Sequence, residues 1–228
     1  MPSPRWVEPQ LSKLVEKAPT GPNWVHEIKF DGYRMAARID HGKVQLLTRS
    51  GLDWTAKYPA TAAAFAKLSV KTAYIDGELC GVRADGVTSF ELMQQSADAG
   101  YGSLVHFAFD LIELDGEDVA RLPLLERKQR LARLLKDPPA GIVYSEHEGG
   151  DGEAFRRAAC RHGLHSVKSR CQRPIVSIPP EAARRLDPLK LRQVEAADRS
   201  QRVRRRAVGK ARRQRIEMST WREVVAAA

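Results

Sequence analysis

The first half of this 228-residue chain alternates β-prone runs with tight-turn residues, and this pattern most limits its possible folds. We expect strands at Trp24–Lys29, Tyr33–Ile39, Lys43–Thr48, Thr72–Val82 and Leu104–Leu114. Asp40-His41-Gly42 and Asp115-Gly116 are typical of tight turns. Helices are expected at Tyr58–Leu68, Phe90–Ala97, Leu124–Leu135 and Gly152–His162. The pattern predicts a strand-rich α/β (α+β) fold.

One segment of this region has an arrangement of residues suited to covalent nucleotide chemistry. It is the run Glu27-Ile28-Lys29-Phe30-Asp31-Gly32-Tyr33-Arg34. It places a lysine two residues before an Asp-Gly turn and ends on an arginine. A lysine amine attacks phosphorus only when it is deprotonated and positioned, and arginine offers a fixed fork of donors to phosphate oxygens. A strand with an exposed lysine before a turn explains most such hexapeptides, so the run alone is a moderate signal.

Two later runs strengthen the signal. The run Ala73–Leu79 is apolar up to Asp76-Gly77-Glu78, so we expect a carboxylate pair at the end of a buried strand. The run Val105–Ile112 is β-prone and carries Phe107 and Phe109 on one face of a strand with period 2.

Together these three runs resemble nucleotidyltransferase motifs I, III and IIIa of the ATP-dependent DNA ligases, above all the ligase domain of bacterial end-joining ligases. The resemblance is nearly continuous from Trp6 to Leu164. It includes the segments Trp6–Leu11, Leu46–Trp54, Leu122–Lys128 and Tyr144–His147. It implies an ATP-grasp-like nucleotidyltransferase core, in which antiparallel sheets surround a nucleotide cleft.

The resemblance also implies roles for individual residues. Lys29 is the expected nucleophile, which attacks the α-phosphate of ATP to give a lysine-adenylate. Arg34 is expected to clamp the nucleotide or the nick phosphate, and Arg49 to reach the adenylate ribose or the nick 5′-phosphate. Glu78 is expected to bind the ribose or, through water, a metal. Phe109 is expected to stack on adenine, with Phe107 as its competitor, and Glu27 to line the adenine pocket largely through neighbouring backbone groups.

Magnesium is the implied cofactor beside ATP, because nucleotidyl transfer needs charge neutralised on the phosphates. In the family, a motif IV glutamate helps to hold that metal, and motif V lysines bind the α-phosphate. Here the chain instead reads His165-Ser166-Val167-Lys168-Ser169-Arg170, without that glutamate, and motif V is absent. Lys168 is a candidate to replace one of the lysines.

The chain changes character after Leu164. Residues 1–160 hold 20 Lys and Arg against 22 Asp and Glu, a net charge of −2, whereas residues 161–228 hold 18 against 6, a net charge of +12. We therefore expect an adenylation domain at 1–164 and a basic, poorly ordered tail at 165–228 without motifs IV–VI, so that the C-terminal barrel domain is missing or scrambled. A shifted reading frame is one interpretation of this change. Codon degeneracy permits a one-base shift through residues 202–208 to encode Glu-Phe-Val-Val, which resembles the strand that begins the barrel domain of family members. The coding DNA tests it.

Composition limits the cellular compartments in which this chain is expected. No apolar run approaches a membrane span, and Cys80, Cys160 and Cys171 fit neither metal-ligand spacing nor a disulfide framework. A cytoplasmic protein is therefore expected. The resemblance implies a monomeric ligase of nicked or broken double-stranded DNA, in repair or recombination, with a Ku-like end-binding protein as a candidate partner. The alternatives are an inactive remnant of such a ligase, an RNA ligase or GTP-using capping enzyme, and a nucleic-acid-binding module that acts through the basic tail.

Overall fold

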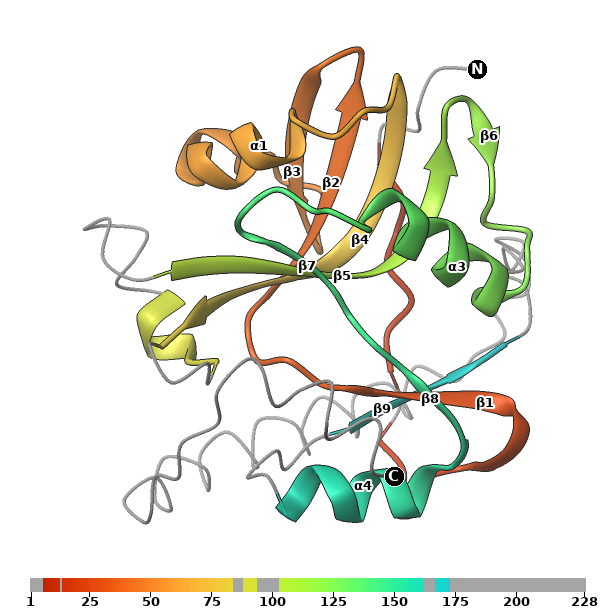
Figure 1. Cartoon of the computed structure of the whole chain (residues 1–228). Coiled ribbons are helices and arrows are strands. Elements are labelled where there is room, and N and C mark those ends of the chain that lie inside the picture. Colours follow the sequence, from red (N-terminus) through yellow and green to blue (C-terminus); the bar gives the residue numbers. More distant parts are fainter. Residues whose placement is uncertain (1–5, 13, 84–87, 94–102, 162–166, 173–228) are drawn as a thin grey trace, which may run out of the picture. The chain divides into compact units, whose positions relative to one another are not determined.

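The computed structural model describes residues 6–12, 14–83, 88–93, 103–161 and 167–172, which form two sheets (Figure 1). The larger sheet has the order β3-β2-β4-β5-β6, and β7 pairs with β5 off this path. Its strands are β2 (Tyr33–Asp40), β3 (Lys43–Thr48), β4 (Thr72–Val82), β5 (Ser103–Leu114), β6 (Glu117–Asp118) and β7 (Ile142–Tyr144). The smaller sheet has the order β8-β1-β9, with β1 (Thr20–Ile28), β8 (Glu148–Asp151) and β9 (Val167–Cys171).

The expected antiparallel arrangement is confirmed, and only β5 and β7 pair in parallel among the described strands. Both expected tight turns are present. His41 and Gly42 have φ values of 49° and 81° between β2 and β3, and Asp115 and Gly116 have φ values of 48° and 86° between β5 and β6. Two consecutive residues with positive φ define the two-residue turn whose twist matches that of the flanking strands. These turns set the register of both hairpins.

The main core lies on one face of β4. This strand is buried along almost its whole length because it lies between β2 and β5, and Ile75 and Leu79 are fully buried on its core face. Side chains alternate between the two faces of a strand, so Tyr74, Asp76 and Glu78 point to the opposite face. The sequence predicted Asp76 and Glu78 at the end of a buried strand. That prediction is wrong, because both residues lie in the middle of β4.

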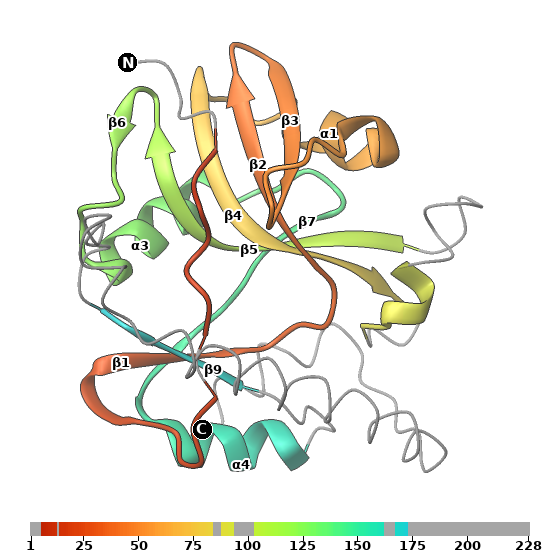
Figure 2. The same cartoon turned by 180° about the vertical axis from the view of Figure 1, so that it is seen from behind.

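Helices cover the sheets where the apolar pattern predicted them (Figure 2). The helix expected at Tyr58–Leu68 is shorter, because a 3₁₀ turn (Thr55–Lys57) precedes α1 (Pro59–Phe65). Phe65 of α1 and Leu131 of α3 (Leu124–Leu134) both join the main core. α4 (Gly152–Arg161) packs against the smaller sheet. Residues 90–93 are helical, and the remainder of that expected helix lies outside the described residues.

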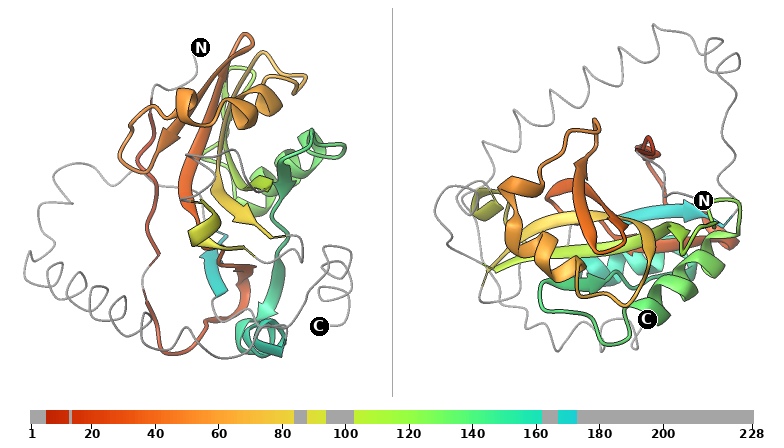
Figure 3. Two further views of the ribbon diagram at one scale, coloured as in Figure 1. Left: turned by 90° about the vertical axis from the view of Figure 1, so that its left-hand side faces the viewer. Right: turned by 90° about the horizontal axis from the view of Figure 1, so that it is seen from above.

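The smaller sheet, which Figure 3 shows from two further sides, differs most from the strands that the sequence predicted. β1 begins at Thr20, four residues earlier than expected, because its first residues pair with β8, and it ends at Ile28, so Lys29 follows the strand. β9 lies beyond the boundary expected at Leu164 and pairs with β1 from Trp24↔Cys171 to Ile28↔Val167. Residues 173–228, where a barrel domain was expected to be missing or scrambled, lie outside the described residues. In the described part of the chain, no helix is long and apolar enough to cross a membrane.

Candidate active site

Lys29 lies on the loop that connects the smaller sheet to the larger one. Its side chain is exposed, immediately after the end of β1. Gly32 holds this loop against β4, because a Cβ atom at Gly32 would lie 2.2 Å from the Leu79 carbonyl oxygen and 2.6 Å from Cys80 Sγ. Only a residue without a side chain permits so close an approach. The glycine of the expected motif therefore places Lys29 beside β4.

Phe30, the residue after Lys29, gives the same loop a second anchor. Its ring stacks on Phe107 of β5, with ring centroids 3.9 Å apart and an interplanar angle of 11°. Phe107, the competitor for adenine stacking, is therefore already covered by a residue of the Lys29 loop. The loop after Lys29 is therefore anchored twice, by the stacked pair at Phe30 and by the close backbone approach at Gly32.

Arg34 is engaged with a carboxylate that the sequence did not single out as its partner. Its Nε and Nη2 atoms donate to the two carboxylate oxygens of Asp76, at 2.7 and 2.5 Å. This bidentate pair joins β2 to β4 and is the geometry that best suits guanidinium and carboxylate. Arg34 lies opposite Glu78 in the strand register. The expected phosphate clamp is thus held in position by Asp76.

Glu78 is a carboxylate without an ion-pair partner among the described residues. Burial raises its pKa, and the nearby positive charges of Arg34, Lys168 and Lys29 act in the opposite direction. Because Lys29 is one of these charges, Glu78 lies close to the expected nucleophile. A half-buried carboxylate that lacks a protein partner is suited to bind a ribose hydroxyl or a hydrated cation.

Phe109 is buried and surrounded by cations. The guanidinium carbon of Arg34 lies 4.4 Å from the centroid of its ring, Lys168 Nζ 4.5 Å, and the guanidinium carbon of Arg170 5.6 Å. Such contacts are favourable because the ring face carries negative charge density. Adenine stacking on Phe109, as expected from the sequence, would place the base on a ring that three cations already approach. That role stays a prediction.

Lys168 brings the altered C-terminal segment into the site. It lies on β9 opposite Glu27 of β1, and no carboxylate among the described residues pairs with its ammonium. Burial and the charges of Arg34 and Arg170 lower the pKa of Lys168 to about 8. Lys168 was expected only as a candidate replacement for a motif V lysine, and the structure places it against Phe109 and near Glu78.

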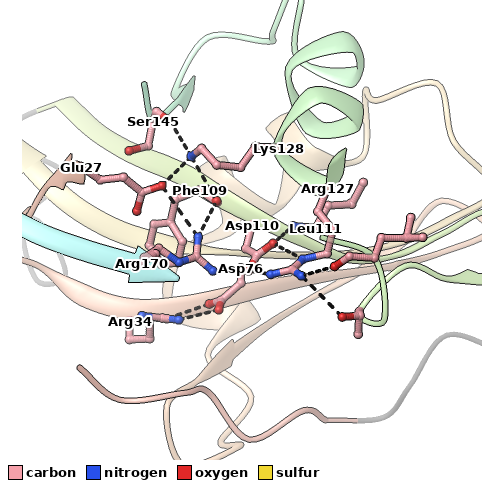
Figure 4. A network of polar contacts seen from close by, with 12 residues as sticks. Glu27, Arg34, Asp76, Phe109, Asp110, Leu111, Arg127, Lys128, Ser145 and Arg170 are labelled. Carbon is pink, nitrogen blue, oxygen red and sulfur yellow. Dashed lines mark hydrogen bonds and ion pairs between the residues drawn. The ribbon is translucent and has the colours of Figure 1, made fainter. Parts of the chain in front are cut away.

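Glu27 and its partners form a buried charged network that sequence analysis missed (Figure 4). Lys128 Nζ donates to Glu27 Oε1 at 2.5 Å. Arg127 donates to both carboxylate oxygens of Asp110, at 2.8 and 3.0 Å, and Arg170 also pairs with Asp110. Burial favours a higher pKa for Asp110, but the two arginines lower it to about 2.

A helical pattern in the sequence carried the missing signal. The buried residues of α3 are Leu124, Arg127, Lys128 and Leu131, which follow the spacing i, i+3, i+4, i+7 of one helix face. Arg127 and Lys128 therefore occupy positions that an apolar residue normally takes. Two adjacent cations in an apolar stripe predict buried partners of opposite charge.

Arg49 does not join the other residues. It follows β3, its side chain is exposed, and it makes no hydrogen bond or ion pair within the part of the chain that the structure describes. A role at the nick phosphate therefore stays a prediction.

The described residues of the site offer few protein ligands for a magnesium ion. No cluster of three or more His, Cys, Asp or Glu side chains suited to a metal occurs among the described residues. Of the two carboxylates expected on β4, Asp76 is occupied by Arg34, and Glu78 has no ion-pair partner among the described residues. Mg²⁺ commonly takes only one or two protein carboxylates, with water and substrate phosphates as its other ligands. The donor set fits such a hydrated ion.

Comparison with known proteins agrees with this geometry. The family described as "ATP dependent DNA ligase domain" matches residues 7–159. The multifunctional non-homologous end joining protein LigD of Pseudomonas aeruginosa is 37% identical over 171 residues, which cover 73% of this chain and 20% of that protein. The corresponding LigD DNA repair protein of Mycobacterium tuberculosis (strain H37Rv) is 35% identical over 145 residues, 63% of this chain and 18% of that protein. The chain thus spans about a fifth of the length of these relatives.

Solved structures show the same fold. The ligase domain of M. tuberculosis LigD superimposes on this chain with a TM-score of 0.60 at 30% sequence identity. The matched residues make up 68% of this chain and 50% of that domain. A mycobacterial DNA ligase D complexed with ATP and MES gives a TM-score of 0.58 at the same identity and the same coverage of both chains. The match of sequence and fold, over the residues that build the Lys29 site, shows that the chain belongs to the ATP-dependent DNA ligase domain family.

Proposed function

We propose that this chain is the adenylation domain of a DNA ligase of the end-joining type and that Lys29 is its nucleophile. The Lys29 Nζ atom attacks the α-phosphorus of ATP, a nitrogen–phosphorus bond forms, and the bond to the pyrophosphate oxygen breaks. The amine loses its proton, and pyrophosphate leaves. The AMP then moves to a DNA 5′-phosphate, and the adjacent 3′-hydroxyl displaces AMP and seals the strand.

The position of Lys29 is the observation that carries this proposal. The lysine is exposed on a loop that Gly32 and Phe30 hold against the larger sheet, and Glu78 and Arg34 lie next to it. An accessible amine near an arginine fork and an unpaired carboxylate suits attack on a bound nucleotide. The solved relative that carries ATP supports the choice of nucleotide.

Other residues complete the proposed site. Arg34, oriented by Asp76, binds a phosphate with its remaining N–H donors, while Arg49 reaches the ribose or the nick 5′-phosphate. Glu78 binds the ribose or holds Mg²⁺ through water, and a bound Mg²⁺ supplies charge neutralisation on the phosphates. Phe109 stacks on adenine, and the backbone around Glu27 lines the base pocket.

The biological setting is part of the same proposal. The relatives are end-joining proteins, one of them named as a DNA repair protein, which supports nicked or broken double-stranded DNA as the substrate in repair or recombination. We infer a monomer in the cytoplasm that works with a Ku-like end-binding protein. We propose two domains, 1–164 for adenylation and 165–228 as a basic tail whose first residues add β9 to the smaller sheet of the adenylation domain.

The intact mass of the purified protein, after incubation with ATP and Mg²⁺, tests the central step. We expect a single AMP adduct on the wild type and none on Lys29→Ala. A parallel incubation with GTP distinguishes a ligase from a capping enzyme. A folded wild-type protein without an adduct would identify a remnant ligase and overturn the proposal.

A further inference from the structure

Lys128 is a buried cation whose ammonium donates to three oxygen atoms (Figure 4). The acceptors are Glu27 Oε1 at 2.5 Å, the Ser145 carbonyl oxygen at 3.0 Å and the Phe109 carbonyl oxygen at 3.4 Å. Lysine has three donors, so each proton of this ammonium has an acceptor. The group is completely buried, and Glu27 is almost so.

The three acceptors come from three different parts of the fold. Glu27 is on β1 of the smaller sheet, two residues before Lys29. Phe109 is on β5 of the larger sheet, and Ser145 follows β7. Lys128, from α3, therefore connects the strand that leads to the proposed nucleophile with the strand that carries the proposed adenine platform.

Arg170 of β9 makes a parallel connection. Its Nη1 atom donates to the Phe109 carbonyl oxygen at 3.0 Å and lies 3.7 Å from Glu27 Oε1. The Phe109 carbonyl and the Glu27 carboxylate are thus each approached by two cations. These contacts restrict the Phe109 backbone and the Glu27 side chain together.

Stability of the fold gives no sufficient reason for this arrangement. Burial lowers the pKa of Lys128, and the charge and hydrogen bond of Glu27 counteract the shift. Removing two charges from water is costly, and apolar residues of similar volume often replace a buried ion pair without loss of stability. Leu124 and Leu131 already supply apolar packing on the same helix face.

We propose that Lys128 is a positioning residue for adenylation, which holds Glu27 and the Phe109 backbone where the nucleoside of ATP binds. This inference rests on the proposed adenylation of Lys29. Lys128 does not touch the nucleotide in this role but acts through Glu27 and Phe109. Its loss should therefore weaken the binding of ATP more than it slows the transfer at saturating ATP.

The test measures the rate of Lys29–AMP formation against ATP concentration, together with denaturant unfolding. The variants are Lys128→Met, Glu27→Gln and the double variant, and Lys136→Met is the control because Lys136 is exposed just after α3. We expect the ATP concentration for half-maximal rate to rise at least tenfold in Lys128→Met and to remain unchanged in Lys136→Met. Glu27→Gln alone should have a smaller effect, because Lys128 still donates to both carbonyl oxygens.

The double variant separates positioning from folding. It leaves no unpaired charge from the pair, so we expect it to regain stability relative to Lys128→Met, yet to retain at least a fivefold higher ATP requirement than Glu27→Gln. If the double variant matches Glu27→Gln in ATP dependence, Lys128 is only structural and the inference is wrong. A wild-type protein that forms no adduct contradicts the proposed function instead, so the two failures are distinguishable.

Discussion

At the scale of single residues, His106 shows how burial determines a protonation state. Its ring is fully buried, Nε2 lies 2.8 Å from the Met35 carbonyl oxygen, and Nδ1 has no hydrogen-bond partner among the residues that the structure describes. Nε2 therefore carries the proton and donates it. Burial lowers the pKa of His106 to about 4, against 6.5 for an ordinary histidine. A second proton, on Nδ1, would leave a buried charge without an acceptor.

This shift predicts a loss of stability in acid. Between pH 6.5 and about 4 the unfolded chain binds a proton at His106 that the folded chain does not, so stability falls as pH falls. The loss has a maximum slope of about 1.4 kcal/mol per pH unit and a total on the order of 3 kcal/mol. Denaturant unfolding at several pH values from 7.5 to 4.5 measures it.

His106→Gln supplies the comparison, because its amide can donate to the Met35 carbonyl but does not titrate. We expect the variant to have a shallower dependence of stability on pH across this window. His147, whose pKa is also lowered to about 4 by burial, contributes equally to both proteins. Identical slopes for wild type and His106→Gln would show that burial does not shift the pKa of His106 between the unfolded and folded states.

At the scale of elements, the loop between β1 and β2 depends on Gly32. An alanine Cβ there would meet the β4 backbone at 2.2 Å, so the loop or the strand must move. We predict that Gly32→Ala lowers the rate of lysine-AMP formation at least tenfold and destabilises the protein by about 1–3 kcal/mol, the usual cost of overpacking. Adduct formation and denaturant unfolding measure the two effects.

Gly149 provides a matched control for this substitution. It lies on β8, and a Cβ at this position would have no atom within 4 Å. Gly149→Ala should therefore form the adduct at the wild-type rate. If Gly32→Ala behaves like Gly149→Ala, the close approach to β4 does not position Lys29.

The elements also show how far sequence reasoning reaches. β2 to β5 and their turns were predictable, because β-prone apolar runs and positive-φ turn residues are local signals, whereas the short strands β6 and β7 were not predicted. β8 reads Glu-Gly-Gly-Asp and has no such signal, and its pairing with β1 joins residues more than a hundred positions apart. In the candidate site, Lys29 was recognisable from its motif, whereas the helix stripe marked Lys128 only as a buried cation and could not identify its partner Glu27, which lies on a distant strand.

At the scale of the whole molecule, charge is unevenly distributed along the chain. Residues 1–160 carry a net charge of −2 and residues 161–228 a net charge of +12. The proposed substrate is a polyanion, and phosphate contacts by Lys and Arg release counterions from DNA. The C-terminal region should therefore contribute most of the salt-dependent affinity for DNA.

Replacement of Arg204, Arg205 and Arg206 by glutamine tests this expectation in the full chain. Each phosphate contact contributes about 0.9 to the slope of log affinity against log salt concentration, so the slope should decrease by up to about 2.7. The matched control replaces three exposed lysines of the adenylation domain, Lys43, Lys67 and Lys71, by glutamine. Binding to a nicked duplex, measured by fluorescence anisotropy over a salt series, gives both slopes. A larger decrease in the control would place the DNA contacts on the adenylation domain instead. An unchanged lysine-AMP yield in the arginine variant would show that this region acts on DNA and leaves the first chemical step intact.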